Sequence, residues 1–327
     1  MATTYNKIYL APLAGYTDLP FRRVCRRQGL QYAYTALIDA GALVYGNKEN
    51  RIILARGDDE PWLGVQLLGS RLDFIEKAVP ILNEMPYDEF NFNMGCPVKK
   101  VVQRDAGAAL LKHPEHALDC VRLIRKLVKR PFTVKIRILS ETDTDATVQF
   151  CRKLVEEGVE GIFIHGRVAT KVYSGPVAAE IISAVREAVA VPVVANGGIF
   201  TWEDGQELAR RTGCEGIMVA RGAIGNPWLF KSLLEGHEVS PTHGELCDMI
   251  DLHLRSMMEL YGEEDGLVNG RKIILGYLGG RGYHRSLKLD VCSIRKEPEF
   301  NDLLKRIRED RDSAEIVPQG KHLVVES

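Results

Sequence analysis

One cysteine of this chain stands where a strand could hold it in place for chemistry. Cys96 lies in the segment FNFNMGCP (residues 90–97), in which an apolar strand ends in an asparagine, a glycine, the thiol and a proline. Glycine allows a tight turn and proline fixes the exit of the chain, so the thiol and the amide of Asn93 stand on rigid backbone. Most free cysteines are small buried hydrophobic residues, but the neighbours of Cys96 favour a catalytic thiol.

Two cations sit within a strand that otherwise looks like barrel core. The segment FTVKIRI (residues 132–138) places Lys135 and Arg137 on one face and its branched apolar residues on the other. Two cations that face the interior of a protein cost free energy unless an anion lies between them. The strand therefore predicts a bound anionic cofactor or substrate.

The elements that must position these side chains alternate between strands and helices. We predict eight strands at Lys7–Ala14, Tyr32–Ile38, Trp62–Leu67, Glu89–Asn93, Phe132–Ile138, Gly161–His165, Pro192–Asn196 and Gly216–Ala220. The clearest helical patterns between them are Leu72–Met85, Pro114–Lys129, Ala146–Glu157, Ala178–Val189 and Trp202–Arg211. Eight such units in a row predict an α/β fold, a (β/α)8 TIM barrel, and an open doubly wound sheet is the alternative.

The carboxyl ends of the last strands carry glycine, as a phosphate site would require. Asn196, Gly197 and Gly198 end the seventh strand, and Ala220, Arg221 and Gly222 end the eighth. Backbone amides at these two positions form the phosphate site that is usual in barrels. His165, at the end of the sixth strand, is either a satisfied polar residue or a cofactor contact, and its neighbours favour contact. No His, Cys or carboxylate spacing suits a metal, so we expect none.

Composition limits the class of protein. The 327 residues are 45% hydrophobic, 27% charged and 7% aromatic, with a formal net charge of −1, as in a globular enzyme. Seven widely spaced cysteines without a Cys-x-x-Cys motif suit a reducing compartment, and no apolar run approaches the roughly 18 residues of a membrane span. We therefore expect a cytoplasmic protein without a membrane anchor.

The β pattern stops after the barrel. Helical patterns follow at His243–Tyr261, Gly270–Leu278 and Phe300–Arg311. We predict a barrel domain over residues 1–235, a small all-helical C-terminal domain over residues 240–312 and a flexible tail over residues 313–327.

Several of these motifs together resemble the tRNA-dihydrouridine synthase family. They are LAPLAGYTDLPFR (residues 10–22), NMGCP (93–97), VKIR (134–137), HGR (165–167) and RGAIGNPW (221–228). The resemblance covers the whole barrel and, more faintly, the helical domain. It implies an enzyme that binds FMN and reduces the C5–C6 bond of particular uridines in tRNA, with NADPH as the electron donor.

The resemblance also implies roles for individual residues. Cys96 would protonate C5 of uracil after a hydride passes from reduced FMN to C6, and Asn93, Arg137 and Arg167 would bind the substrate. FMN would be held by Pro12, Leu13, Ala14, Gln66, Lys135, His165, Asn196, Gly197, Gly198, Ala220, Arg221 and Gly222.

A tRNA partner requires local positive charge, because the net charge of the chain is near zero. Residues 270–311 hold eleven basic and six acidic residues, a balance of 11 − 6 = +5. We expect the helical domain to bind tRNA and the protein to be a monomer. Two alternatives remain: an FMN barrel reductase that acts on a small pyrimidine or enone, and a tRNA-binding or chaperone-like protein.

Overall fold

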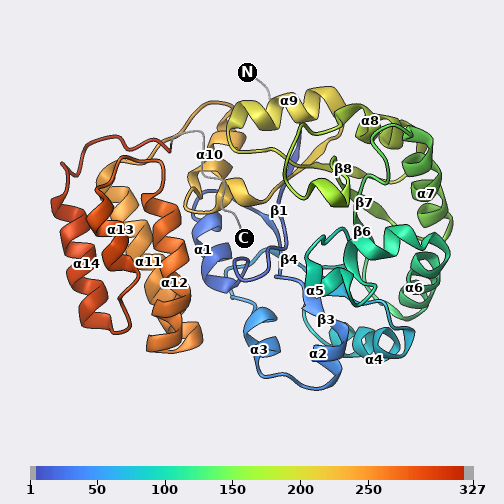
Figure 1. Cartoon of the computed structure of the whole chain (residues 1–327), viewed down its shortest axis with the longest axis horizontal. Helices are drawn as coiled ribbons and strands as arrows, with labels where there is room; N and C mark the ends of the chain where they lie inside the picture. Colours follow the sequence, from blue (N-terminus) through green and yellow to red (C-terminus); the bar gives the residue numbers. More distant parts are fainter. Residues whose placement is uncertain (1–4, 320–327) are drawn as a thin grey trace.

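The computed structural model describes residues 5–319 and shows a closed barrel of parallel strands beside a helical domain (Figure 1). The barrel strands are β1 (Lys7–Leu10), β2 (Tyr32–Tyr34), β4 (Trp62–Leu68), β5 (Glu89–Met94), β6 (Phe132–Arg137), β7 (Gly161–His165), β8 (Val193–Asn196) and β9 (Gly216–Val219). Each pairs in parallel with its neighbours, and the β2–β4 and β1–β9 pairings close the ring. The predicted (β/α)8 barrel is confirmed.

The second predicted strand is interrupted. It was expected to run over Tyr32–Ile38, but β2 ends at Tyr34, and a two-residue strand, β3 (Ile38–Asp39), pairs separately with the end of β4. The cause is the amide of Ala36, which donates to the carbonyl of Thr17 in the β1–α1 loop and so leaves the sheet.

Helices cover the outside of the barrel. They are α1 (Leu19–Arg26), α4 (Leu72–Asn83), α6 (Pro114–Leu127), α7 (Thr144–Glu156), α8 (Ala179–Ala188), α9 (Trp202–Thr212) and α10 (Trp228–Glu235). The five predicted helices are all present, and α9 begins with a capping box between Thr201 and Asp204. Two short helices, α2 (Ala40–Val44) and α5 (Lys99–Val102), follow the carboxyl ends of β3 and β5, and a third, α3 (Glu49–Ile53), follows α2.

Aromatic rings fill the barrel beneath its carboxyl end. Phe163 packs edge to face against Tyr9 and Tyr34, with ring centroids 5.0 and 5.4 Å apart. Two residues further along β7, on the same face, lies His165. The interior therefore changes from aromatic to polar toward the carboxyl ends of the strands.

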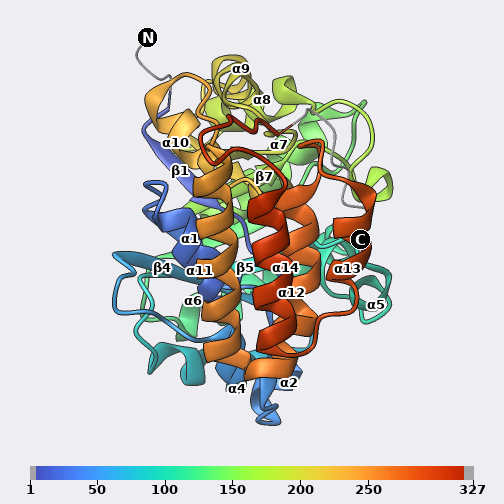
Figure 2. The same ribbon diagram turned by 90° about the vertical axis from the view of Figure 1, so that its left-hand side faces the viewer.

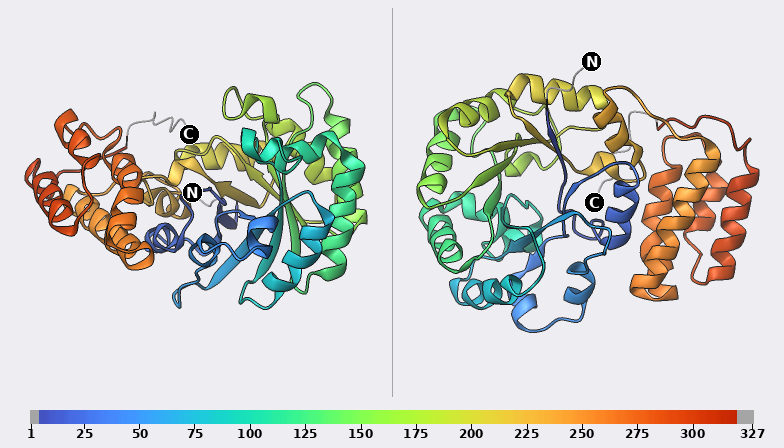
Figure 3. Two further views of the ribbon diagram at one scale, coloured as in Figure 1. Left: turned by 60° about the horizontal axis from the view of Figure 1, so that its bottom comes forward. Right: turned by 180° about the vertical axis from the view of Figure 1, so that it is seen from behind.

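The helical domain lies to one side of the barrel, as both views in Figure 3 show. It comprises α11 (His243–Tyr261), α12 (Glu263–Leu278), α13 (Arg285–Val291) and α14 (Glu297–Glu309). The sequence predicted a helix only from Gly270, yet α12 begins at Glu263. Its glycines serve close packing: a Cβ at Gly266 would lie 2.7 Å from the Cα of Met258 on α11. No helix within residues 5–319 is both long and apolar enough to cross a membrane.

Part of the expected flexible tail is held in place. The amide of His243 donates to the carbonyl of Glu315, and Thr242 forms a β-bridge with Ile316. Val317 is buried, and its carbonyl accepts a hydrogen bond from Arg281. The segment up to residue 317 therefore belongs to the helical domain, and the expected tail over residues 320–327 lies outside the described residues.

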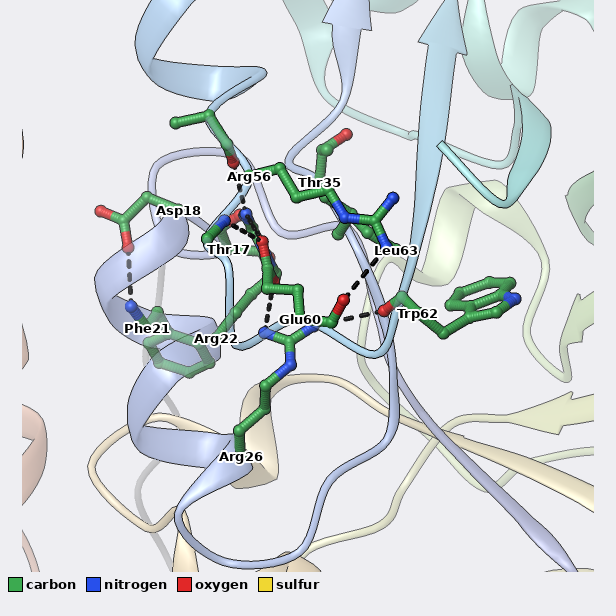
Figure 4. A network of polar contacts seen from close by, with 12 residues as sticks. Thr17, Asp18, Phe21, Arg22, Arg26, Thr35, Arg56, Glu60, Trp62 and Leu63 are labelled. Atoms are coloured by element: carbon green, nitrogen blue, oxygen red, sulfur yellow. Dashed lines mark hydrogen bonds and ion pairs between the residues drawn. The ribbon is translucent and has the colours of Figure 1, made fainter. Parts of the chain in front are cut away.

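A buried ion cluster fixes α1 and the loop before it (Figure 4). Arg22 is fully buried and donates to both carboxylate oxygens of Glu60, at 2.8 and 2.9 Å. It also donates to the carbonyls of Thr17 and Ala55, and Arg26 forms a second ion pair with Glu60. Burial raises the pKa of Glu60, but hydrogen bonds from Arg22 and the charges of Arg22 and Arg26 outweigh it and hold that pKa below its ordinary value.

Replacing Glu60 by Gln should lower the free energy of unfolding by about 3–5 kcal/mol, because two buried guanidinium groups would lose their counter-charge. Denaturant unfolding monitored by circular dichroism would measure the change. The matched control is Glu259→Gln, which breaks the exposed Arg23–Glu259 pair and should cost no more than about 1 kcal/mol. Equal losses for the two variants would contradict this account.

Candidate active site

A single cavity at the carboxyl ends of the barrel strands collects nearly all the predicted site residues. Those that line it are Pro12, Leu13, Ala14, Asn93, Cys96, Lys135, Arg137, His165, Arg167, Asn196, Gly197, Gly198, Ala220, Arg221 and Gly222. They come from loops and strand ends far apart in sequence, and the closed ring of strands brings them together.

Gln66 is the predicted site residue that the structure does not bring to the cavity. Its side chain is fully buried below the cavity floor, where its Nε2 donates to Asn91 at 2.7 Å. Its Oε1 accepts from the amide of Asn93 at 2.6 Å. Gln66 therefore orients Asn93, and both atoms of its amide group are engaged.

Asn93 holds the turn that presents Cys96. Its Oδ1 accepts from the backbone amides of Gly95 and Cys96, at 3.1 and 3.0 Å. Gly107 closes over the other side, since a Cβ there would lie 2.7 Å from the carbonyl oxygen of Cys96. The thiol is partly buried, and burial raises its pKa even though the Val98 amide, Arg137 and Lys135 oppose that rise. Cys96 is therefore a neutral thiol at physiological pH.

Four cations line the cavity, and none of the lining residues is a carboxylate. Lys135 donates to the Oδ1 of Asn196 at 2.8 Å, and Arg137 donates to the carbonyl of Gly95 at 2.9 Å. Burial, followed by the charge of Arg137, lowers the pKa of Lys135 to about 7. Within residues 5–319 none of the four, which include Arg167 and Arg221, forms an ion pair. The cavity is built for an anion.

His165 is held neutral among these cations. Its ring is buried, with Nε2 at 3.3 Å from an Nη of Arg167. Burial and then the charges of Arg137, Lys135, Arg167 and Arg221 lower its pKa well below the ordinary value. The backbone of Gly197 (φ +124°) crosses the ring so closely that a Cβ would lie 2.7 Å from its Cδ2.

The match to known proteins agrees with this geometry. A model of the protein family described as dihydrouridine synthase (Dus) matches residues 9–309. The chain belongs to the dihydrouridine synthase family. It is 33% identical to tRNA-dihydrouridine synthase B of Pasteurella multocida over 280 residues, 84% of each chain. It is 34% identical to a probable tRNA-dihydrouridine synthase of Rickettsia prowazekii over 281 residues, 84% of this chain and 86% of the relative.

A solved structure of low sequence identity shares the fold of this dihydrouridine synthase. Histamine dehydrogenase from Rhizobium sp. 4-9 aligns with a TM-score of 0.54 and 12% identity over 97% of this chain and 64% of that one.

Sequence reasoning missed two aromatic residues that line the cavity of this synthase. Tyr173 lies in the loop after β7, and its ring centroid is 3.8 Å from the guanidinium carbon of Arg221. Tyr16 lies in the loop after β1, under the ammonium of Lys272. A search of the residues at the ends of predicted strands does not find them, because each lies several residues beyond its strand and is positioned by the conformation of a loop.

The neutral thiol of Cys96 has a measurable consequence. With no ligand added, the rate of its alkylation by iodoacetamide should keep rising with pH beyond 9.0, the ordinary pKa of the group, because burial raises its pKa. Mass spectrometry of the Cys96 peptide across pH 6–11 would follow the reaction. The exposed Cys292 is an internal reference for reagent quality. A midpoint below pH 8 for Cys96 would contradict the neutral-thiol assignment.

Proposed function

We propose that this enzyme reduces specific uridines of tRNA to 5,6-dihydrouridine, with FMN as its cofactor and NADPH as the electron donor. The observation that carries the proposal is a cavity with four cations and no carboxylate, beside a neutral thiol, in a chain of the dihydrouridine synthase family. The names of the relatives, tRNA-dihydrouridine synthase B among them, supply the tRNA substrate class.

The residues at the β8 and β9 ends fit the phosphate of FMN. Gly198 adopts φ +72°, and at Gly222 a Cβ would come within 2.2 Å of the carbonyl of Ile199. Side chains are therefore excluded where backbone amides must approach an anion. The guanidinium of Arg221 stacks on Tyr173 and forms no hydrogen bond within the described part of the chain, so it is available to a phosphate.

The ring system of FMN would lie against Pro12, Leu13 and Ala14, which form an apolar wall of the cavity. When bound and reduced, FMN would supply the hydride that the reaction needs. Lys135, fixed by Asn196, would face the anionic side of the ring. Because an anion stabilises the protonated form, binding should raise the pKa of Lys135 from about 7 and keep the ammonium charged.

Cys96 would supply the proton at C5 of uracil. A general acid must carry its proton at the working pH, and burial keeps the thiol neutral. Asn93 holds the backbone that carries the thiol, and Arg137 and Arg167 would contact the uracil carbonyl groups. NADPH would use the same cavity mouth before tRNA arrives.

The charge balance of +5 in residues 270–311 overstates the number of basic residues that are available to tRNA. Many of its basic residues pair within the domain, as in Arg295–Glu264, Arg306–Asp290 and Arg308–Asp248. Arg281 is buried and donates to the carbonyls of Tyr277, Gly225 and Val317. The basic residues available to RNA are therefore few. We propose a cytoplasmic monomer in which these few contacts lie beside the cavity mouth.

Replacing Arg221 by Met should weaken FMN binding about 10- to 150-fold, because a charge-assisted hydrogen bond to the phosphate is worth roughly 1.5–3 kcal/mol. Titration of flavin fluorescence against the protein would measure the dissociation constant. Arg130→Met, which removes an exposed guanidinium before the amino end of β6, is the matched control and should bind FMN as the wild type does. Unchanged affinity of Arg221→Met would place the phosphate elsewhere.

The function itself is tested by dihydrouridine formation in an unmodified tRNA transcript incubated with enzyme, FMN and NADPH. The Cys96→Ala variant should form dihydrouridine about 10²- to 10⁴-fold more slowly, the usual contribution of a general acid. It should keep its FMN and its rate of reduction by NADPH. A small enone or free pyrimidine reduced efficiently while tRNA is not would instead favour the small-molecule reductase.

A further inference from the structure

One lysine of the helical domain reaches the rim of the active-site cavity. Lys272 lies on α12, and its Nζ is 4.6 Å from the ring centroid of Tyr16, which lines the cavity. The same Nζ would lie 3.0 Å from a Cβ at Gly15, in the loop after β1. The residues that line the cavity belong to the barrel, and the helical domain adds an ammonium group beside one of them.

Close packing fixes the position of that ammonium group. Gly276, one turn beyond Lys272 on the same face of α12, packs against the loop after β9, and a Cβ at Gly225 would lie 2.1 Å from the carbonyl carbon of Gly276. Arg281 donates to the carbonyl of Gly225 at 3.0 Å, and the hydroxyl of Tyr261 donates to Asp18 at 2.8 Å. With the two domains joined at both places, Lys272 cannot move far from the cavity.

No described carboxylate lies within ion-pair distance of Lys272. Its side chain is half-buried, and among residues 5–319 it forms no ion pair within 4.0 Å. Asp18 is the carboxylate whose charge it feels, but the two oxygens of Asp18 accept from the Phe21 amide and the Tyr261 hydroxyl. A cation partly removed from water without a partner is costly until an anion arrives.

We propose that Lys272 binds a phosphate of tRNA next to the uridine that enters the cavity, so that the helical domain and the barrel hold the target nucleotide together. This inference rests on the proposed function. The expected phosphate site of FMN lies at the ends of β8 and β9, whereas Lys272 stands over the loop after β1. It is therefore placed for a second phosphate at the outer rim.

Other cations extend from this point along the same side of the molecule. Figure 2 shows α13 and α5 on the same side of the molecule, at the right of that view, and α5 follows the carboxyl end of β5, whose loop lines the cavity. Arg285 and Lys288 of α13, and the exposed Lys99 and Lys100 of α5, have no carboxylate partner among the described residues. An RNA backbone along this side of the molecule would meet these cations together with Lys272, whose ammonium group lies over the cavity-lining ring of Tyr16.

The test uses Lys272→Met in the FMN-loaded enzyme, since methionine keeps the side chain packed on Tyr16 and removes only the charge. Binding of unmodified tRNA transcript, measured by fluorescence anisotropy from 50 to 300 mM salt, should weaken five- to tenfold. The slope of log K against log salt should fall by about 0.7 to 0.9, the loss of one phosphate contact. FMN content, thermal midpoint and the KM for NADPH should stay at wild-type values.

Two variants control the result. Lys126→Met removes an exposed ammonium group from α6, on the opposite side of the barrel from α12 (Figure 1), and should leave tRNA binding unchanged. Lys272→Arg keeps the charge and should restore the affinity and the slope.

Three outcomes would overturn the inference: wild-type tRNA affinity in Lys272→Met, a weaker affinity with an unchanged salt slope, or a raised KM for NADPH with normal tRNA binding. The second would mean a purely structural lysine, and the third a contact to NADPH phosphate. Failure of the proposed function looks different, because the wild-type enzyme would then form no dihydrouridine, whatever Lys272→Met does to tRNA binding.

Discussion

Uncompensated positive charge is the constraint around which the active site is organised. Lys135, Arg137, Arg167 and Arg221 share a cavity lined by no carboxylate, and burial lowers the pKa of each. The barrel holds Lys135 and Arg137 through neutral acceptors, the amide of Asn196 and the carbonyl of Gly95. The guanidinium of Arg221 instead stacks on the ring of Tyr173. Burial and then the same charges lower the pKa of His165 and keep its ring neutral. A bound anion would relieve the repulsion, so binding of the proposed cofactor should also stabilise the cavity.

Small residues allow close packing between the barrel and the helical domain and within the helical domain. Gly225 and Gly276 bring the loop after β9 against α12, and Gly266 brings α12 against α11. On the other side, the buried cluster of Arg22, Arg26 and Glu60 fixes α1, whose cap Asp18 binds Tyr261 of α11. The loop after β1, which carries Pro12 to Tyr16, is held between these contacts. The geometry of the site therefore depends on both domains.

The sequence predicted the barrel, and most of the side chains it singled out at strand ends line one cavity, because strand ends obey simple rules. A lysine in an apolar strand, an Asn-x-Gly-Cys-Pro turn and glycines after the last two strands are all local signals, and the closed ring brings them together. Other features depend on tertiary contacts that no local pattern records. Gln66 lies below the cavity because Asn91 and Asn93 engage its amide. Helix α12 includes Gly266 because α11 packs against it there. Tyr173 lies in a loop, and the spacing of apolar residues does not predict the conformation of a loop.

The central claim is that electrons held by the bound flavin pass to uridine in tRNA. The most direct test is anaerobic: photoreduce the FMN-loaded enzyme, add unmodified tRNA transcript, and follow the return of the oxidised flavin absorbance. We predict fast reoxidation with tRNA, none with free uridine, and dihydrouridine in the recovered RNA in an amount equal to the flavin oxidised. Flavin that stays reduced with tRNA but is reoxidised by a small enone or pyrimidine would contradict the account.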